Sequence, residues 1–245
     1  MRRGRFRPAG AALAALLLPL LPLTGCDRPA APAERAAAGN PAQDAGQGRQ
    51  LPPVVDHVRT DDPVVFLTYD DSAERDPAFA ALIRERRLPV TLFLTDTVAG
   101  PVYGDLARLR PFGASLQNHT LDHRSLRGLP YAGQRAEICG QQTKLKSRFG
   151  VRAHLFRPPH GGYDTTTLRA AADCGITALV LWRAALDAGG DLTYAGGGDH
   201  RLHPGDVVAV DPDDATAANL AARTERLLET IEEQGLRVGN LEKYL

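Results

Sequence analysis

From residue 64 onwards, short apolar runs alternate with longer amphipathic segments. Val64–Thr68 and Val90–Leu94 are compact runs rich in β-branched side chains, as expected for buried parallel strands. Between them, residues 79–87 carry apolar side chains at helical spacing, which predicts a covering helix. The chain thus begins its folded part with a strand–helix–strand unit.

The same alternation continues to the end of the chain. We expect further strands at Ala114–Leu116, His154–Phe156, Ala178–Trp182 and Val207–Val210, and helices around 106–109 and at Tyr131–Phe149, Thr166–Cys174 and Thr216–Gln234. Strands that alternate with helices predict an α/β fold with a parallel sheet covered by helices. About six or seven such units favour barrel-like closure. A dinucleotide-binding sheet is not indicated, because no Gly-rich phosphate loop follows the first strand.

The first 26 residues have the pattern of an export signal. Four arginines among residues 2–7 precede an apolar run over 11–23, which is too short and too interrupted by proline to be a good membrane span. The run ends in Leu23-Thr24-Gly25-Cys26, which resembles the lipobox of bacterial lipoproteins. This resemblance implies that Cys26 is lipidated and anchors the exported protein to the outer face of the plasma membrane. The alternative is an ordinary secretory peptide.

Residues 27–56 are rich in Ala, Pro and Gly, so we expect a flexible tether before a folded domain over 57–245. The length of 245 residues and 43% apolar content suit one such domain. Lys+Arg and Asp+Glu both total 29, and this balance gives no support for nucleic-acid binding. With Cys26 assigned to lipid, Cys139 and Cys174 remain. An oxidising compartment favours a disulfide between them over two buried thiols.

Three polar clusters directly follow predicted strands, where barrel enzymes place their active sites. Asp70-Asp71 could divide metal binding and proton transfer, although such pairs also occur in turns. His119 and His123 would share a helical face and converge on one ion, although histidines at this spacing are common on surfaces. The segment 157–162, Arg-Pro-Pro-His-Gly-Gly, fixes an arginine and several backbone amides, or forms merely a stiff turn.

Together these clusters resemble the polysaccharide deacetylase family, also called the NodB homology domain or carbohydrate esterase family 4. Thr68-Tyr69-Asp70-Asp71 is similar to the first family motif, and His119–His123, preceded by Asn118, is similar to the second. Arg157–Gly161 is similar to the third, with His160 in the place of an aromatic residue. The resemblance implies a distorted (β/α)7 barrel that acts, as a monomer, on an acetylated polysaccharide or peptidoglycan.

The resemblance also implies roles for individual residues. Asp71, His119 and His123 would hold a divalent metal, most often zinc in this family. Asp70 would be the general base that activates water, and Arg157 would hold Asp70 in place. The backbone N–H of His160 would stabilise the oxyanion, a role that tolerates a changed side chain.

The sequence departs from the family in its last motif, a strand that ends in Leu-x-His and supplies the general acid. Here Val207–Val210 reproduces the strand, but Asp211 stands in the place of the histidine. An aspartate is normally ionised at neutral pH and is no ready proton donor. His160 and His203 are candidate substitutes, although neither aligns with the missing residue. Asp187 is a candidate support for Arg157.

We therefore expect a metal-dependent hydrolase that removes acetyl groups from nitrogen or oxygen of a polysaccharide, weakened by Asp211. Esters need protonation of the leaving group less than amides do. The alternative is a catalytically inactive, glycan-binding surface lipoprotein that keeps the metal. A third hypothesis is a structural wall-associated domain without metal.

Overall fold

The computed structural model describes residues 50–71, 76–195, 199–210 and 219–245 of the chain. The expected signal peptide with Cys26, most of the expected tether, and Asp211 lie outside these described residues. Within the described part, none of the helices combines the length and the apolar character that crossing a membrane requires.

The chain forms ten strands and six α-helices in its described part. The strands are β1 (Val54–Val55), β2 (Val64–Asp70), β3 (Thr91–Leu94), β4 (Ser115–Asn118), β5 (Leu155–Phe156), β6 (Ala178–Val180), β7 (Ala184–Leu186), β8 (Leu192–Tyr194), β9 (Val207–Val210) and β10 (Arg237–Val238). The helices are α1 (Pro77–Arg86), α2 (Asp96–Ala99), α3 (Tyr103–Ala107), α4 (Tyr131–Phe149), α5 (Thr165–Asp173) and α6 (Leu220–Glu233).

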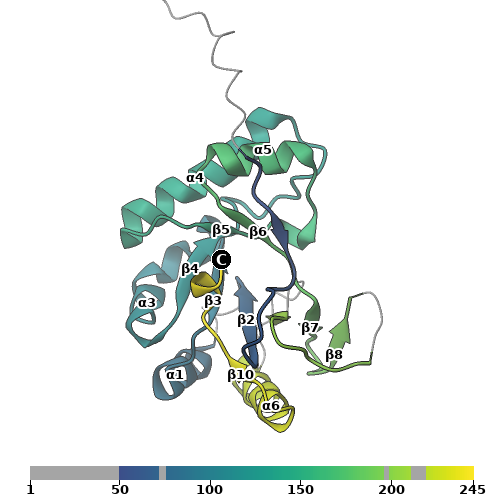
Figure 1. Cartoon of the computed structure of the whole chain (residues 1–245). Coiled ribbons are helices and arrows are strands. Elements are labelled where there is room, and N and C mark those ends of the chain that lie inside the picture. Colours follow the sequence, from purple (N-terminus) through teal and green to yellow (C-terminus); the bar gives the residue numbers. More distant parts are fainter. Residues whose placement is uncertain (1–49, 72–75, 196–198, 211–218) are drawn as a thin grey trace, which may run out of the picture. The chain divides into compact units, whose positions relative to one another are not determined.

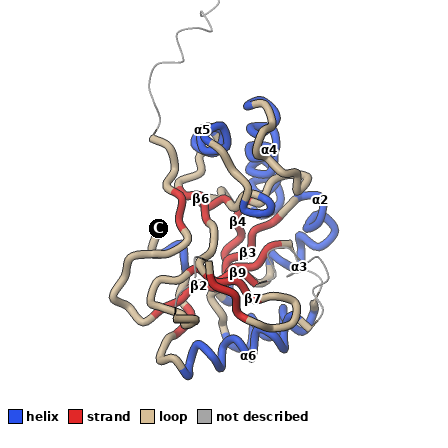
Figure 2. The backbone as a smooth tube through the Cα atoms, turned by 90° about the vertical axis from the view of Figure 1, so that its right-hand side faces the viewer, coloured by secondary structure: helices blue, strands red, loops and turns tan. Residues whose placement is uncertain are grey.

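All these strands belong to one curved sheet, in the order β1-β6-β5-β4-β3-β2-β9-β7-β8, with β10 also paired to β2. The pairs are parallel except for β7 with β8. Figure 1 shows the helices around the outside of the sheet, and Figure 2 shows the strands gathered in the middle of the domain. The sheet is a curled half-barrel, which confirms the expected distorted (β/α)7 architecture.

Strand β2 runs through the centre of the domain, and all seven of its residues are buried. Its side chains alternate between two apolar clusters because successive residues of a strand point to opposite faces. Val65, Leu67 and Tyr69 pack on the helix side, whereas Val64 and Phe66 pack inside the curl. A fully buried apolar strand is therefore what the β-branched run predicted.

The carboxyl ends of the central strands are aligned at one edge of the sheet. Asp70 is paired with Phe93 of β3, and Leu94, at the end of β3, is paired with Asn118 of β4. Asn118 is in turn paired with Phe156 of β5. The residues that follow these strand ends therefore meet at the same edge, although they are far apart in the sequence.

Several predicted elements agree closely with the structure, and others need correction. Helix α4 and strand β9 have the expected bounds, and Cys139 and Cys174 form the expected disulfide, with their Cα atoms 5.0 Å apart. However, β1 lies within the predicted tether and pairs with β6, so the folded domain begins before residue 57. Strands β7, β8 and β10, of two or three residues each, were not predicted.

Candidate metal centre and active site

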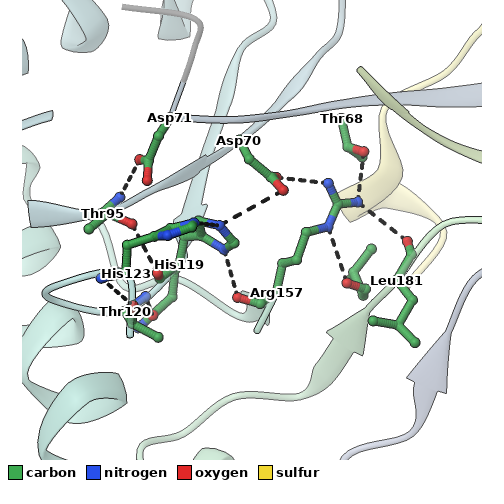
Figure 3. A network of polar contacts seen from close by, with 11 residues as sticks. Thr68, Asp70, Asp71, Thr95, His119, Thr120, His123, Arg157 and Leu181 are labelled. Atoms are coloured by element: carbon green, nitrogen blue, oxygen red, sulfur yellow. Dashed lines mark hydrogen bonds and ion pairs between the residues drawn. The ribbon is translucent and has the colours of Figure 1, made fainter. Parts of the chain in front are cut away.

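Arg157 lies at the centre of the polar network, directly after β5, and is completely buried. Its Nη1 donates to Oδ1 of Asp70 at 2.8 Å, and its Nη2 donates to Oγ1 of Thr68 at 2.7 Å (Figure 3). Thr68 and Asp70 can both reach it because they are two residues apart on β2 and share a face. The arginine thus holds the Asp70 carboxylate in a fixed place.

Two further donors and the faces of the Arg157 guanidinium are also occupied. Nε and Nη2 donate to the backbone oxygens of Val180 and Leu181, both at 3.3 Å. The rings of Phe93 and Trp182 lie against the guanidinium, with their centroids 4.4 and 5.3 Å from its central carbon. Complete burial lowers the pKa of Arg157, and the attraction of Asp70 counteracts this effect. These contacts offset the high cost of burying a charged group.

Asp71 follows β2 directly and is oriented by the neighbouring strand end. Its Oδ1 accepts the backbone N–H of Thr95 at 2.8 Å. Its Oδ2 is buried and has no hydrogen-bond partner among the described residues. A buried carboxylate oxygen without a partner is costly, whereas coordination of a cation would satisfy it. This orphaned oxygen could therefore serve as a ligand to a cation.

His119 and His123 lie in the loop after β4, which corrects the expectation that they share a helical face. Thr120 and His123 have left-handed backbone angles, with φ of 78° and 54°. Such angles are unusual outside glycine, and local hydrogen bonds hold them here. The side chain of Asn118 accepts from the N–H of Thr120, and Oγ1 of Thr120 accepts from the N–H of His123. This turn, rather than a helix, brings the two imidazoles together.

The two imidazoles present nitrogen atoms to one point. Nε2 of His119 and Nε2 of His123 are 3.1 Å apart, and the ligand atoms of Asp71, His119 and His123 all lie within 4.8 Å of one another. Nδ1 of His119 is 2.8 Å from the backbone oxygen of Arg157, which can only accept, so Nδ1 carries the hydrogen and Nε2 keeps its lone pair. Burial, reinforced by His119, lowers the pKa of His123 and favours the neutral imidazole that ligates metals.

The candidate base adjoins this triad. Oδ2 of Asp70 lies 3.8 Å from Nε2 of His119, while the other oxygen of the carboxylate is held by Arg157. One carboxylate of the adjacent pair therefore faces the arginine and the other, Asp71, faces the ligand nitrogens. The two adjacent carboxylates therefore have different partners, Arg157 for Asp70 and the backbone of Thr95 for Asp71.

His160 lies in a short 3-10 turn, Pro159–Gly161, beside the histidine pair. Its backbone is left-handed, with φ of 57°, and its exposed ring stands 5.0 Å from the ring of His123, measured between centroids. The turn therefore places a third imidazole, and the peptide that carries it, next to the candidate metal ligands.

Two other predicted residues stand apart from the site. Asp187 does not support Arg157: its Oδ1 accepts from the backbone of Asp191 within an exposed turn. The backbone oxygens of Val180 and Leu181 take that supporting place instead. His203 precedes β9 and contacts Asp206, at the opposite edge of the sheet from the strand ends that carry the triad.

Sequence reasoning also missed contributors to the site. Thr68 was recognised only as part of the first motif and was given no role, yet its hydroxyl accepts a hydrogen bond from Arg157. Thr95 was not identified at all, although its N–H orients Asp71 and its hydroxyl donates to the backbone oxygen of His119. Its place directly after β3, at the edge where all three motifs lie, is the signal that could have identified it.

A family model described as polysaccharide deacetylase matches residues 57–179, half of the 245 residues. The chain therefore belongs to the polysaccharide deacetylase family. A protein of Streptomyces coelicolor, named only as uncharacterized, is 88% identical to it over 100% of both chains.

Two solved structures share the fold at low sequence identity. A family 4 carbohydrate esterase from Streptomyces lividans, in complex with acetate, superposes with a TM-score of 0.60 at 24% identity, over 72% of this chain and 92% of its own. A family 4 pseudoenzyme from Bacillus anthracis superposes with a TM-score of 0.63 at 17% identity, over 79% of this chain and 69% of its own. The half-barrel is thus a fold of this esterase family.

Proposed function

We propose that the protein is a divalent-metal-dependent deacetylase that removes acetyl groups from a cell-surface or extracellular polysaccharide. The observation that carries this proposal is the convergence of the Asp71, His119 and His123 ligand atoms, with the orphaned Oδ2 of Asp71 among them, beside the buried Asp70–Arg157 pair. Membership of the polysaccharide deacetylase family supports the type of reaction.

The donor set fits zinc. One carboxylate oxygen and two imidazole nitrogens suit Zn²⁺, and three protein ligands are typical of catalytic zinc sites, which leave a position open. Lewis acidity toward the acetyl carbonyl and the attacking water is the chemistry that such a metal supplies when bound. The contact of His119 with the backbone of Arg157 is the outer support that metal-ligating histidines commonly have.

The side chains around the triad perform the proton transfer. Asp70, oriented by Arg157, takes a proton from water as the water oxygen bonds to the acetyl carbon. The backbone N–H of His160 donates to the oxygen that gains negative charge. The C–N bond of an amide, or the C–O bond of an ester, then breaks. The leaving nitrogen or oxygen takes up a proton from solvent, to which Asp70 returns its own, and acetate is released.

The test is release of acetate by zinc-loaded protein from acetylated chito-oligomers, peptidoglycan and acetylated xylan. We expect turnover on at least one of these polymers, and loss of both bound zinc and turnover in His119→Ala. His154→Ala is the matched control, because His154 is exposed and remote from the triad in sequence. No acetate from any of the polymers with metal-replete wild-type protein would reject the proposal.

The second candidate function is a glycan-binding protein that keeps the metal without turnover. Asp211 in place of the family's general acid favours it, although Asp211 lies outside the described residues. Retention of the Asp70–Arg157 pair favours the enzyme, because a passive pocket has no use for a held base. Asp211→His separates the two: a gain in acetate release would identify an enzyme that lacks its acid, and unchanged polymer binding without turnover would favour the binding protein.

We also propose that the protein works outside the cell, as a monomer anchored by lipid on Cys26 to the outer face of the plasma membrane. The lipobox-like sequence that ends at Cys26 supports this location. The disulfide between Cys139 and Cys174 is consistent with an oxidising compartment.

A further inference from the structure

One turn of α4, residues Glu137–Gln141, lies against the loop His119–His123, which we call the metal loop. Oε2 of Glu137 accepts the backbone N–H of Asp122 at 3.1 Å. Glu137 is only 6% exposed, and none of the described lysines or arginines forms an ion pair with it. A buried carboxylate is costly unless it has a specific partner, and the partner here is the backbone next to His123.

The next residue of α4 holds the start of the same loop. The backbone oxygen of Ile138 accepts from Nδ2 of Asn118 at 2.9 Å. Oδ1 of Asn118 in turn accepts the N–H of Thr120 at 3.0 Å, at the residue whose φ is 78°. The helix thus supports the unusual backbone of the loop through one amide side chain.

Gly140 provides the space that the loop occupies. A Cβ atom at this position would lie 2.8 Å from Cγ of Leu121, which is in the middle of the metal loop, and would overlap its Cδ1. Glycine within a helix is unfavourable relative to alanine, so its presence here requires a reason. Close packing of the loop on the helix is that reason.

The far side of the same turn is anchored independently of the loop. Cys139 is joined to Cys174 after α5, and Ile138 is fully buried in an apolar cluster with Ala170 and Ala171 of α5. The turn is therefore a rigid surface on which the loop rests, rather than a part of the loop that moves with it.

We propose that Glu137 and Gly140 are positioning residues that set the metal affinity of the site by holding the metal loop in its ligating conformation. The proposal rests on the metal-dependent function proposed above. Neither residue touches the ligand atoms; each acts on the backbone or side chain between His119 and His123. Residues that orient metal ligands typically contribute about 10- to 100-fold to metal affinity.

Four variants test the proposal, each measured for its Zn²⁺ dissociation constant by competition with a chromogenic chelator, and for the visible spectrum of the Co²⁺-substituted protein. We expect Glu137→Ala and Gly140→Ala to bind Zn²⁺ about 10- to 100-fold more weakly, with an altered Co²⁺ spectrum. Glu137→Gln, which keeps an oxygen acceptor for the Asp122 N–H, should recover most of the affinity. Gln142→Ala is the control, because Gln142 bonds to Ala153 and Cys174 instead of the loop.

The variants also separate positioning from folding. Gly140→Ala introduces a better helix former, so weaker metal binding at unchanged or higher thermal stability of the metal-free protein can only reflect the displaced loop. Wild-type affinity and an unchanged Co²⁺ spectrum in both Glu137→Ala and Gly140→Ala would overturn the proposal while leaving the proposed function intact. Absence of stoichiometric Zn²⁺ in the wild-type protein would overturn the proposed function itself.

Discussion

At the scale of single residues, Arg157 connects the two halves of the candidate active site. Its guanidinium binds Asp70, the proposed base, and its backbone oxygen orients His119, a proposed metal ligand. The two roles use different parts of the residue, because the oxygen belongs to the main chain. A substitution of the Arg157 side chain should therefore remove the contact with Asp70 and keep the backbone contact that orients His119.

The first prediction concerns Asp70, the proposed general base. Asp70→Asn keeps an oxygen acceptor for Arg157 and removes the group that takes the proton. We expect the turnover number to fall by about 100- to 10,000-fold while the zinc content stays at the wild-type value. Acetate release and metal analysis on the same preparation measure both. Loss of zinc together with activity would instead identify Asp70 as a ligand.

The second prediction concerns the histidine in the family's aromatic position. His160→Phe keeps the backbone N–H that we assign to the oxyanion, so turnover should change by less than about tenfold. If the His160 side chain transferred a proton, its removal would lower the turnover number about 100-fold or more. Steady-state kinetics therefore decide between the two roles, and Asp70→Asn provides the matched case of a lost proton-transfer group.

At the scale of elements, Asp164 ties the start of α5 to the loop that follows the metal loop. Its carboxylate caps α5 through the N–H of Thr167, and it also accepts the N–H of Gly128 and the side chain of Gln134 from α4. These hydrogen bonds, that of Gly128 first, lower the pKa of Asp164 from 3.8 to about 2. One carboxylate thus joins two helices and a loop.

This pKa predicts how stability depends on pH. The folded-state pKa lies below the ordinary value, so the stabilisation is complete above about pH 4 to 5 and is lost as the pH falls from 3.8 towards 2. We expect Asp164→Ala to reduce the free energy of unfolding by about 0.5–2 kcal/mol at pH 7, as for other helix caps. Urea denaturation should show this difference narrowing at pH 2.5. A difference independent of pH would contradict the role of the ionised group.

At the scale of the whole molecule, the half-barrel brings the strand ends together at one edge, and β1 brings the N-terminal side of the domain against β6. The described part of the chain thus enters the fold at an edge strand. An anchor at Cys26 would leave the site on a domain joined to the membrane by the segment between Cys26 and β1.

The fourth prediction is that Cys26 carries lipid. In a bacterial host, the full-length protein should incorporate labelled palmitate and sediment with membranes, because acyl chains attach it to the bilayer. Cys26→Ser should take up no label and should no longer be processed at the lipobox. Cys139→Ser is the control for cysteine loss as such. Equal labelling of wild-type and Cys26→Ser protein would exclude lipid on this residue.

The residue types and their order along the chain were sufficient to predict the metal triad and the base candidate. Asp70 ends β2 and Asp71 follows it directly. His119 and His123 lie in the loop after β4, and Arg157 follows β5. Parallel strands end at one edge, so local information sufficed to group these residues. The long helix α4 was equally readable, because Gly150 ends it in a left-handed conformation.

Only the tertiary structure decided how these residues reach one another. The metal loop is no helix. Asn118 holds it locally through the N–H of Thr120, and Glu137 holds it from α4, a contact across 15 residues that no local propensity encodes. Backbone oxygens of β6 and its following loop, rather than Asp187, complete the support of Arg157, and a carbonyl group leaves no signature in sequence. The sequence by itself determined which polar side chains stand at which strand ends, because motifs and apolar runs are local. Long-range hydrogen bonds and packing determined the geometry of the site.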